Sequence, residues 1–281
     1  AWLGRAILYP RHAFHVMKDP HTMAYIDLPG MRLWYTDSGG TGIPVIFLHA
    51  ASGNCDSWTY QNLAFAAAGY RCIAYDRRNW GRSQPADTGE QPGYVGDDLH
   101  GLVEHLRIDR FHLVATAAGG IGALDYALEH PELVRSVVAA NTIGGVQNPY
   151  YIEVQRRLRP TEIQNLPIEL RELGPAYRGT NLQGTEKWIL IERSNHPNSD
   201  AHPPAQPLRN PLTLSRLGSM KVPVLMVTGD ADLLSPPALM RLLAAPIPDC
   251  QIANVPEAGH AGFWERPDIW NSLVLEFLRQ Y

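Results

Sequence analysis

Short apolar runs alternate with helical patterns along most of the chain. The apolar runs typical of strands fall near 23–29, 32–37, 44–48, 71–76, 111–115, 135–141, 222–228 and 251–255. Helical patterns fall near 57–68, 94–106, 118–130, 237–245 and 267–279. Such alternation predicts an α/β fold, with a mostly parallel eight-stranded sheet covered by helices on both faces and an antiparallel hairpin formed by the first two strands.

One long segment, residues 144–217, does not follow this alternation. It is polar and rich in arginine and proline, and short helices are expected near 150–159, 161–172 and 185–193. In open α/β sheets ligands bind at the carboxyl ends of the strands, so we expect this segment to close over that edge as a lid. The predicted organisation is an extension over 1–22, a core formed by 23–143 and 218–281, and the lid.

Composition narrows the class of protein. The chain has 281 residues and a formal net charge of −4, with acidic and basic residues interspersed, so neither a nucleic-acid partner nor a membrane partner is expected. Its three cysteines, Cys55, Cys72 and Cys250, lack the spacing of metal ligands and are interpreted as reduced thiols of a cytoplasmic protein. The oligomeric state is left open.

A sharp turn after the strand near 111–115 carries the first candidate chemistry. The sequence there is Leu-Val-Ala-Thr-Ala-Ala-Gly-Gly, and it reads as a strand that breaks into a helix. A turn of this type needs small residues two positions before and after its tip, and Ala115 and Gly119 meet that demand. The tip, where a nucleophile belongs, is Ala117.

Two further loops supply an acid and a base. The strand at 222–228 runs into Gly229-Asp230-Ala231-Asp232, and the last strand is followed by His260. A carboxylate in one of these loops can fix the tautomer and orientation of a histidine in the next. After the strand at 44–48, the segment 49–53 can turn backbone N–H groups toward a developing oxyanion, together with the N–H of Ala118.

With these parts in this order, the chain resembles the α/β-hydrolase fold superfamily from about Met23 to Tyr281. The loop Tyr75 to Ser83 is also similar to the segment that follows the fourth strand of that family. The resemblance implies that Asp232 is the acid of a catalytic triad and His260 its base, and that the amides of Ala51 and Ala118 form the oxyanion hole. The family's register selects Asp232 over Asp230. This chain departs from the family at Ala50, where glycine is usual, and at Ala117, where serine is usual.

Several side chains are candidates for contact with substrate, and each has a structural alternative. The candidates are His49, Ser52, Tyr150, Trp188 and Trp264. His49 can instead hold the oxyanion loop by hydrogen bonds, and Ser52, like Thr116, is expected to make a local hydrogen bond. Aromatic residues of the lid can equally pack the lid onto the core.

The sequence therefore predicts an enzyme that hydrolyses a small, partly apolar carboxylic ester or lactone, or a C–C bond of a vinylogous diketone. Ala117 allows two interpretations. Either it replaces a serine and inactivates the enzyme, or it is native and His260 acts as a general base in a lyase or cofactor-free oxygenase reaction. A ligand receptor without catalytic activity is a further alternative. No metal and no organic cofactor is implied, because the sequence contains no ligand cluster and no glycine-rich dinucleotide loop.

Overall fold

The computed structural model describes residues 22–85, 93–195 and 206–281. The strands are β1 (Thr22–Leu28), β2 (Met31–Asp37), β3 (Pro44–Leu48), β4 (Arg71–Tyr75), β5 (Gln84–Pro85), β6 (Phe111–Thr116), β7 (Val134–Ala140), β8 (Val224–Gly229) and β9 (Cys250–Val255). The helices of the core are η1 (Cys55–Trp58), α1 (Thr59–Ala67), α2 (Val95–His105), α3 (Ala118–Glu129), α9 (Pro237–Ala244), α10 (Gly262–Glu265) and α11 (Pro267–Leu278).

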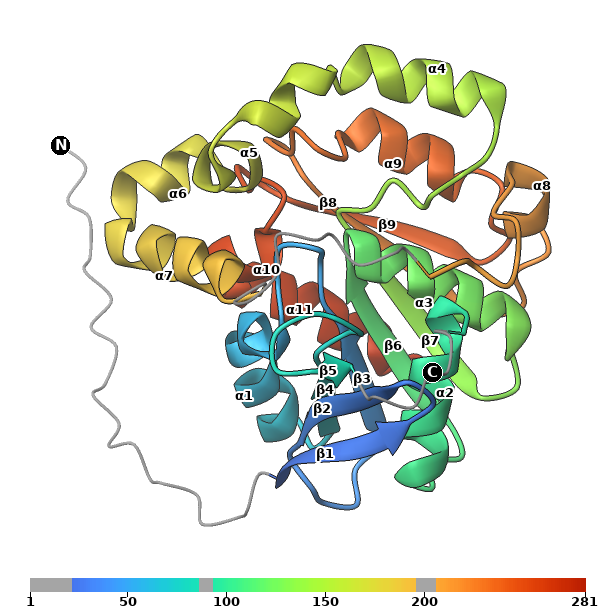
Figure 1. Ribbon diagram of the computed structural model, residues 1–281. Helices are drawn as coiled ribbons and strands as arrows, with labels where there is room; N and C mark the ends of the chain where they lie inside the picture. Colours follow the sequence, from blue (N-terminus) through green and yellow to red (C-terminus); the bar gives the residue numbers. More distant parts are fainter. Residues whose placement is uncertain (1–21, 86–92, 196–205) are drawn as a thin grey trace, which may run out of the picture.

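The strands form one nine-stranded sheet in the order β1-β2-β4-β3-β6-β7-β8-β9, with the two-residue β5 paired to β2 (Figure 1). β1 and β2 form the predicted antiparallel hairpin, and β2 meets β4 antiparallel. From β4 through β9 all neighbours are parallel. The predicted fold is confirmed. β5 was not predicted, because a strand of two residues is too short to produce a recognisable sequence pattern.

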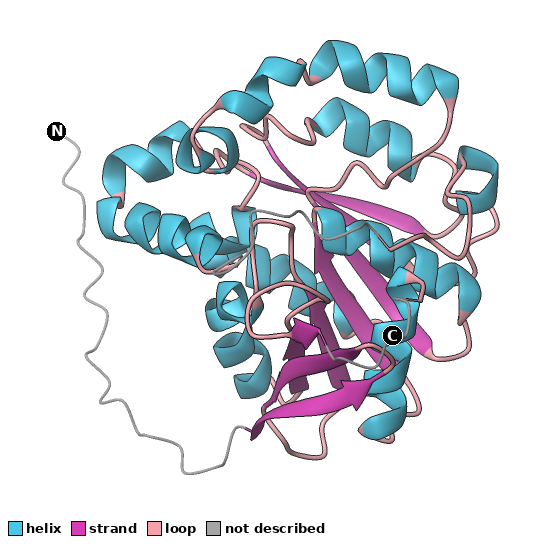
Figure 2. Cartoon of the chain, viewed as in Figure 1, coloured by secondary structure: helices cyan, strands magenta, loops and turns pink. Residues whose placement is uncertain are grey.

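Alternation along the central strands divides the core into two apolar layers, one on each face of the sheet. Ile46 and Leu48 of β3 join the layer under α2, α3 and α9, whereas Val45 and Phe47 join the layer under α1 and α11. Both faces of these strands are therefore buried, which explains their continuous apolar sequence. Figure 2 shows helices on both sides of the strands.

The lid lies between β7 and β8 in sequence. It contains α4 (Pro149–Leu158), η2 (Thr161–Asn165), α5 (Ile168–Glu172), α6 (Pro175–Thr180), α7 (Leu182–Arg193) and α8 (Leu214–Leu217). The expected helices are present, with the one near 161–172 divided into η2 and α5, and α6 and α8 are additional. Figure 1 shows α4 to α7 gathered at one end of the sheet. Of the predicted extension, residues 1–21 lie outside the described residues, and Thr22 already belongs to β1.

The cysteines are free thiols, buried at Cys55 and Cys72 and partly exposed at Cys250. Cys250 thus lies in a strand, as expected, but at its edge rather than in the core. Among the described residues no helix combines the length and apolar character needed to span a bilayer.

Candidate functional site

Ala117 occupies a strained backbone position at the junction of β6 and α3. Its φ and ψ are 49° and −115°, outside the regions that alanine ordinarily adopts. The turn brings the first residues of α3 against the end of β3, where a Cβ on Gly119 would lie 2.3 Å from the carbonyl oxygen of Leu48. Only glycine fits there, so the glycine of the motif is required by a close backbone contact.

Asp232 and His260 lie side by side at the carboxyl ends of β8 and β9. Nδ1 of His260 is 3.0 and 3.1 Å from the two carboxylate oxygens of Asp232. The carboxylate also accepts hydrogen bonds from the backbone N–H groups of Leu234 and Ser235, from the Ser235 hydroxyl, and from the side-chain amide of Asn141. These donors fix the carboxylate, and the carboxylate in turn fixes the ring of His260.

Charge and burial shift the pKa of both groups of this pair. Burial opposes ionisation of Asp232, but the adjacent His260 and the hydrogen-bond donors outweigh it and hold the pKa of Asp232 well below its usual value. Burial also opposes the charged form of His260, and Asp232 outweighs that effect and raises the pKa of the imidazole. Because Nδ1–H is donated to Asp232, the neutral ring has Nε2 free to accept a proton.

The oxyanion loop after β3 is held from behind by His49. Its Nδ1 donates to the carbonyl oxygen of Ala50 at 2.6 Å, and its Nε2 accepts from the backbone N–H of Arg77 at 2.9 Å. Complete burial and the charge of Arg77 lower the pKa of His49 to about 3, so the ring is neutral, as these two bonds require. Trp80 adds a hydrogen bond from its indole N–H to the carbonyl oxygen of Ala51.

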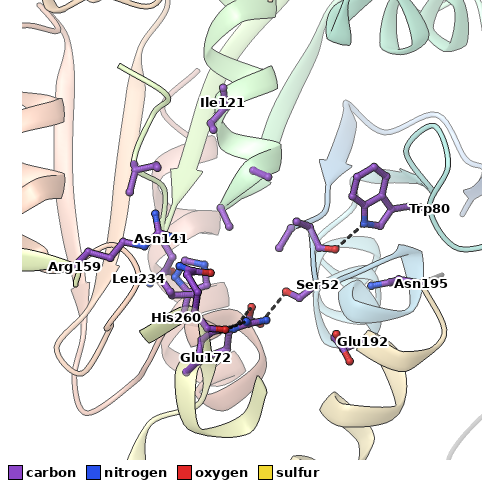
Figure 3. A pocket seen from close by; sticks show the side chains of 17 residues that line it. Ser52, Trp80, Ile121, Asn141, Arg159, Glu172, Glu192, Asn195, Leu234 and His260 are labelled. Carbon is purple, nitrogen blue, oxygen red and sulfur yellow. Dashed lines mark hydrogen bonds and ion pairs between the residues drawn. The ribbon is translucent and has the colours of Figure 1, made fainter. Parts of the chain in front are cut away.

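A cavity of about 410 Å³ joins these parts (Figure 3). It is lined by Ala50, Ala51, Ser52, Trp80, Ala117, Ala118, Ile121, Asn141, Ile143, Arg159, Gln164, Arg171, Glu172, Glu192, Asn195, Leu234 and His260. Figure 3 shows His260 and Glu172 on one side of the cavity and Asn195 and Glu192 on the other. The structure therefore brings together three parts around one space: the sharp turn at Ala117, called the elbow below, the Asp232–His260 pair and the loop of Ala51.

Three polar atoms of the lining residues are buried without a hydrogen-bond partner in the described part of the chain. They are Oδ1 of Asn141, Nδ2 of Asn195 and Nε of Arg171. Buried polar atoms are usually paired, so these three atoms are exceptions, although Nε of Arg171 lies 3.9 Å from a carboxylate oxygen of Glu172.

Glu172 brings a second carboxyl group into the cavity from the lid. It accepts hydrogen bonds from the hydroxyl of Ser52 at 2.8 Å and from the indole N–H of Trp188 at 3.2 Å. Burial raises the pKa of Glu172, and His260 and the two donors oppose that shift. The expectation of a local hydrogen bond for Ser52 was wrong, because its partner lies 120 residues away and ties the oxyanion loop to the lid.

Glu265 fastens the lid to the histidine loop. One carboxylate oxygen accepts from the backbone N–H of Gly259, next to His260, and the other accepts from Gly174 at the start of α6. Both distances are 2.9 Å. Burial raises the pKa of Glu265 to about 7, against the effect of these two donors.

The other predicted substrate contacts do not line the cavity. His49 is fully buried behind the loop, and Tyr150 on α4 is 63% exposed. Trp188 and Trp264 are buried against each other, with ring centroids 5.5 Å apart, and join the lid to the core. The structure thus places these aromatic residues in the alternative role, as packing between lid and core.

Several residues of the site carried no assignment in the sequence. Asn141 follows β7 directly, so its position at the carboxyl end of a parallel strand was a usable signal. Ser235 stands three residues after Asp232, a spacing typical of side-chain bonds to the backbone. Glu172, Arg159 and Arg171 belong to the lid, and no sequence pattern shows which polar residues of a lid face inward.

No group of side chains suited to a metal ion is found in residues 22–85, 93–195 and 206–281.

Comparison with known proteins identifies the family. The sequence profile described as alpha/beta hydrolase fold matches residues 43–267. A 2-hydroxy-6-oxo-6-phenylhexa-2,4-dienoate hydrolase of Burkholderia cepacia is 31% identical over 267 residues, covering 89% of this chain and 92% of that protein.

Two solved structures superpose well. An esterase from Thermogutta terrifontis has a TM-score of 0.74 at 24% identity and covers 93% of this chain and 99% of its own. Est816, an N-acyl homoserine lactone degrading enzyme, has a TM-score of 0.72 at 25% identity and covers 90% and 99%. At 24% identity, the similarity to the Thermogutta esterase is evidence for the fold alone.

Proposed function

Because this chain belongs to the α/β hydrolase fold family, we propose that it acts on a small, partly apolar carbonyl compound and that its reaction is hydrolysis of a carboxylic ester or lactone. The observation that carries the proposal is the buried Asp232–His260 pair, which faces the same cavity as the elbow at Ala117. Ala51 and Ala118 line that cavity, and in this proposal their backbone amides face the carbonyl oxygen that develops negative charge.

In the form with serine at position 117, the hydroxyl attacks the carbonyl carbon and His260 accepts its proton at Nε2. Asp232 holds the imidazole and stabilises its charged form, and the two amides stabilise the tetrahedral oxyanion. His260 then returns the proton to the leaving group, and water repeats the sequence to release the acid. The positive φ retained at Ala117 supports this assignment, because a strained turn has a purpose when it presents a reactive atom.

The named activities of similar proteins support the carbonyl class. The Burkholderia relative is named for C–C hydrolysis of a dienoate, and Est816 for degradation of a lactone. C–C hydrolysis is the finer alternative to ester or lactone hydrolysis for this chain. The free thiols support a cytoplasmic setting.

With alanine at position 117, the cavity lacks the attacking oxygen. Removing the serine of a hydrolase triad lowers kcat by about 10⁶. We therefore expect the chain as it stands to bind its substrate and to turn it over very slowly.

The test compares turnover of para-nitrophenyl butyrate and of γ-butyrolactone by the chain as it stands, by Ala117→Ser, and by Ala117→Ser combined with His260→Ala. We expect Ala117→Ser to raise kcat at least about 10³-fold and the second change to abolish the gain. Absence of hydrolysis that depends on His260 in every form would sink the proposal.

A second candidate function follows from the carboxyl group of Glu172 in the same cavity. His260 as base and Glu172, whose pKa is raised by burial, as acid would move protons on a substrate without any nucleophile, as in a lyase or a cofactor-free oxygenase. Exchange of α-deuterium from a labelled ketone, catalysed by the unaltered chain and lost in His260→Ala, would favour it. Saturable binding without any consumption would favour the receptor alternative instead.

A further inference from the structure

A second cavity, of about 400 Å³, lies on the other side of the elbow from the Asp232–His260 pair. Its polar residues are Tyr75, Arg77, Arg78, Asn79, Asp98, Gln147 and Gln206, and the rest of its lining includes Trp80, Leu208 and residues of β3, α2 and α3. Nothing in the proposed chemistry uses this space. Its charged residues decide what it can hold.

The two arginines of this cavity differ in their partners. Arg78 is 7% exposed and forms a close ion pair with Asp98, with a nitrogen–oxygen distance of 2.6 Å. Arg77 has no ion pair within the described chain, and its Nε and Nη2 are buried without a hydrogen-bond partner. Burial lowers the pKa of Arg77 to about 10, which leaves it charged at neutral pH. The cavity therefore contains one uncompensated cation.

Arg77 as a whole is partly exposed, but buried N–H donors without a partner are costly, and proteins rarely retain them without a use. The guanidinium of Arg77 lies 4.5 Å from the centroid of the Trp80 ring, a contact that orients it but does not neutralise it. Nε and Nη2 lie on one edge of the guanidinium plane, and two parallel N–H donors on that edge match a carboxylate. Asp98 in the same cavity disfavours a dianion such as a phosphate monoester.

The two cavities share a wall. Trp80, Ala118 and Ile121 line both of them, and Ala118 supplies an amide of the proposed oxyanion hole. A single ligand that reaches both cavities past these three residues would present a carbonyl at Ala117 and a second group at Arg77. Trp80 contacts both ends of this path, because it stacks on Arg77 and donates to the carbonyl of Ala51.

From this geometry we propose that the substrate carries a carboxylate remote from its reactive carbonyl, and that Arg77 binds that carboxylate in the second cavity. This inference rests on the proposed function for the reactive end of the ligand. It makes Arg77 a specificity-determining residue for half-esters and carboxylated lactones. Arg77 is a binding group and takes no part in proton transfer.

Binding is measured by isothermal titration calorimetry on the chain as it stands, which lacks the nucleophile and should leave the ligand intact. The ligands are the monomethyl esters of succinic, glutaric, adipic and pimelic acids, with the dimethyl esters as neutral counterparts and phenyl phosphate as the alternative anion. We expect at least one half-ester to bind at least about tenfold more tightly than its diester and than phenyl phosphate.

Arg77→Met should remove that preference, Arg77→Lys should keep part of it, and Arg156→Met should keep all of it. Arg156→Met is the matched control, because it makes the same charge change at an exposed ion pair of α4. Equal affinity of Arg77→Met and the unaltered chain for the half-ester would overturn the proposal. Equal affinity of the unaltered chain for half-ester and diester, or a preference for phenyl phosphate, would also overturn it.

Two further measurements separate this proposal from misfolding and from the proposed function. Arg77→Met should have a melting temperature no lower than that of the unaltered chain, because it loses no hydrogen bond. A loss of ligand affinity in this variant then cannot be ascribed to unfolding. In the Ala117→Ser background, Arg77→Met should raise KM for mono-para-nitrophenyl glutarate at least about tenfold and leave para-nitrophenyl butyrate within about twofold. Half-ester binding through Arg77 without any turnover by Ala117→Ser would remove the hydrolase proposal and retain this one.

Discussion

At the scale of single residues, the candidate chemistry depends on how Asp232 is held. Its two oxygens receive His260, two backbone N–H groups, a hydroxyl and an amide, so the carboxylate has little freedom to turn. A carboxylate held in this way keeps its charge at low pH and keeps the histidine in one orientation. Both properties are measurable through the pH dependence of turnover.

Replacement of Asp232 by asparagine in the Ala117→Ser background should lower kcat by about 10⁴, since the ring loses its tautomer and its counter-charge. The base must be neutral, so activity rises as pH rises through the pKa of His260. Because Asp232 raises that pKa, the acid limb should lie above pH 6.5 with aspartate and move to lower pH with asparagine.

The measurement is kcat/KM for para-nitrophenyl butyrate as a function of pH. Asp230→Asn is the matched control, because that neighbouring carboxylate is exposed and, within the described residues, its side chain pairs with Asn254 alone. Asp230→Asn should change neither kcat/KM nor the position of the acid limb of the pH profile. An unmoved limb in Asp232→Asn would contradict the assignment of the pair.

The sequence identified Asp232, His260 and the elbow because each stands at a strand end in a fixed order. It could not identify Glu172, whose role depends on how α5 lies across the cavity. Ser52 illustrates the same limit, since its partner is a lid residue and no local pattern pointed to it. Residues placed by the sheet were thus predictable, and residues placed by the lid were not.

At the scale of secondary-structure elements, the elbow depends on close backbone contact between α3 and β3. Gly119 leaves no room for a side chain between the helix and the carbonyl oxygens of Leu48 and His49. The contact sets the start of α3, and with it the direction of the amide of Ala118. A methyl group at this position would separate the two elements.

Gly119→Ala should therefore destabilise the fold by about 1–3 kcal/mol and lower the activity of the Ala117→Ser form, because the added Cβ forces the helix away from the strand. Urea denaturation provides the free energy of unfolding. Gly179→Ala in α6 is the control, because a Cβ there meets nothing within 4 Å. If both substitutions cost the same, the close contact does not determine the elbow.

The predicted strands and long helices have counterparts in the structure, because strands buried on both faces of the sheet require long apolar runs, which are visible in the sequence. The elements that the sequence missed are short: β5, η1, α6, α8 and α10 have between two and six residues. Elements of this length bury too few side chains to produce a period. Their positions are set by the tertiary contacts around them.

At the scale of the whole molecule, the lid and the core are joined by buried polar groups as well as by aromatic packing. Glu172 binds the oxyanion loop, and Glu265 binds both the start of α6 and the loop of His260. The lid is thus connected to the parts of the site that carry the chemistry. Ionisation of Glu265 should affect stability in a defined direction.

The folded state raises the pKa of Glu265 from 4.5 to about 7, so between these values the folded chain holds a proton that the unfolded chain releases. The contribution of this group to stability is then fully present below pH 4.5 and is lost as pH rises toward 7, with a slope of up to about 1.4 kcal/mol per pH unit. Glu265→Gln lacks this slope.

Urea denaturation at pH 5 and pH 8 tests this directly. The free energy of unfolding of the unaltered chain, minus that of Glu265→Gln, should be smaller at pH 8 than at pH 5. Glu257→Gln, at an exposed carboxylate of the same loop, should show no such change. A difference for Glu265→Gln that is equal at both pH values would contradict the role of burial.

The unpaired amide atoms at the two sides of the first cavity bear on selectivity. Oδ1 of Asn141 can only accept a hydrogen bond and Nδ2 of Asn195 can only donate one. The first atom therefore needs a donor on the ligand, and the second needs an acceptor. A compound that offers a hydroxyl to the first atom and an ether or carbonyl oxygen to the second relieves two desolvation penalties at once. Its isostere with methyl groups at those points relieves neither, so the enzyme should distinguish molecules of equal size and shape by the polar groups that they present to these two amides.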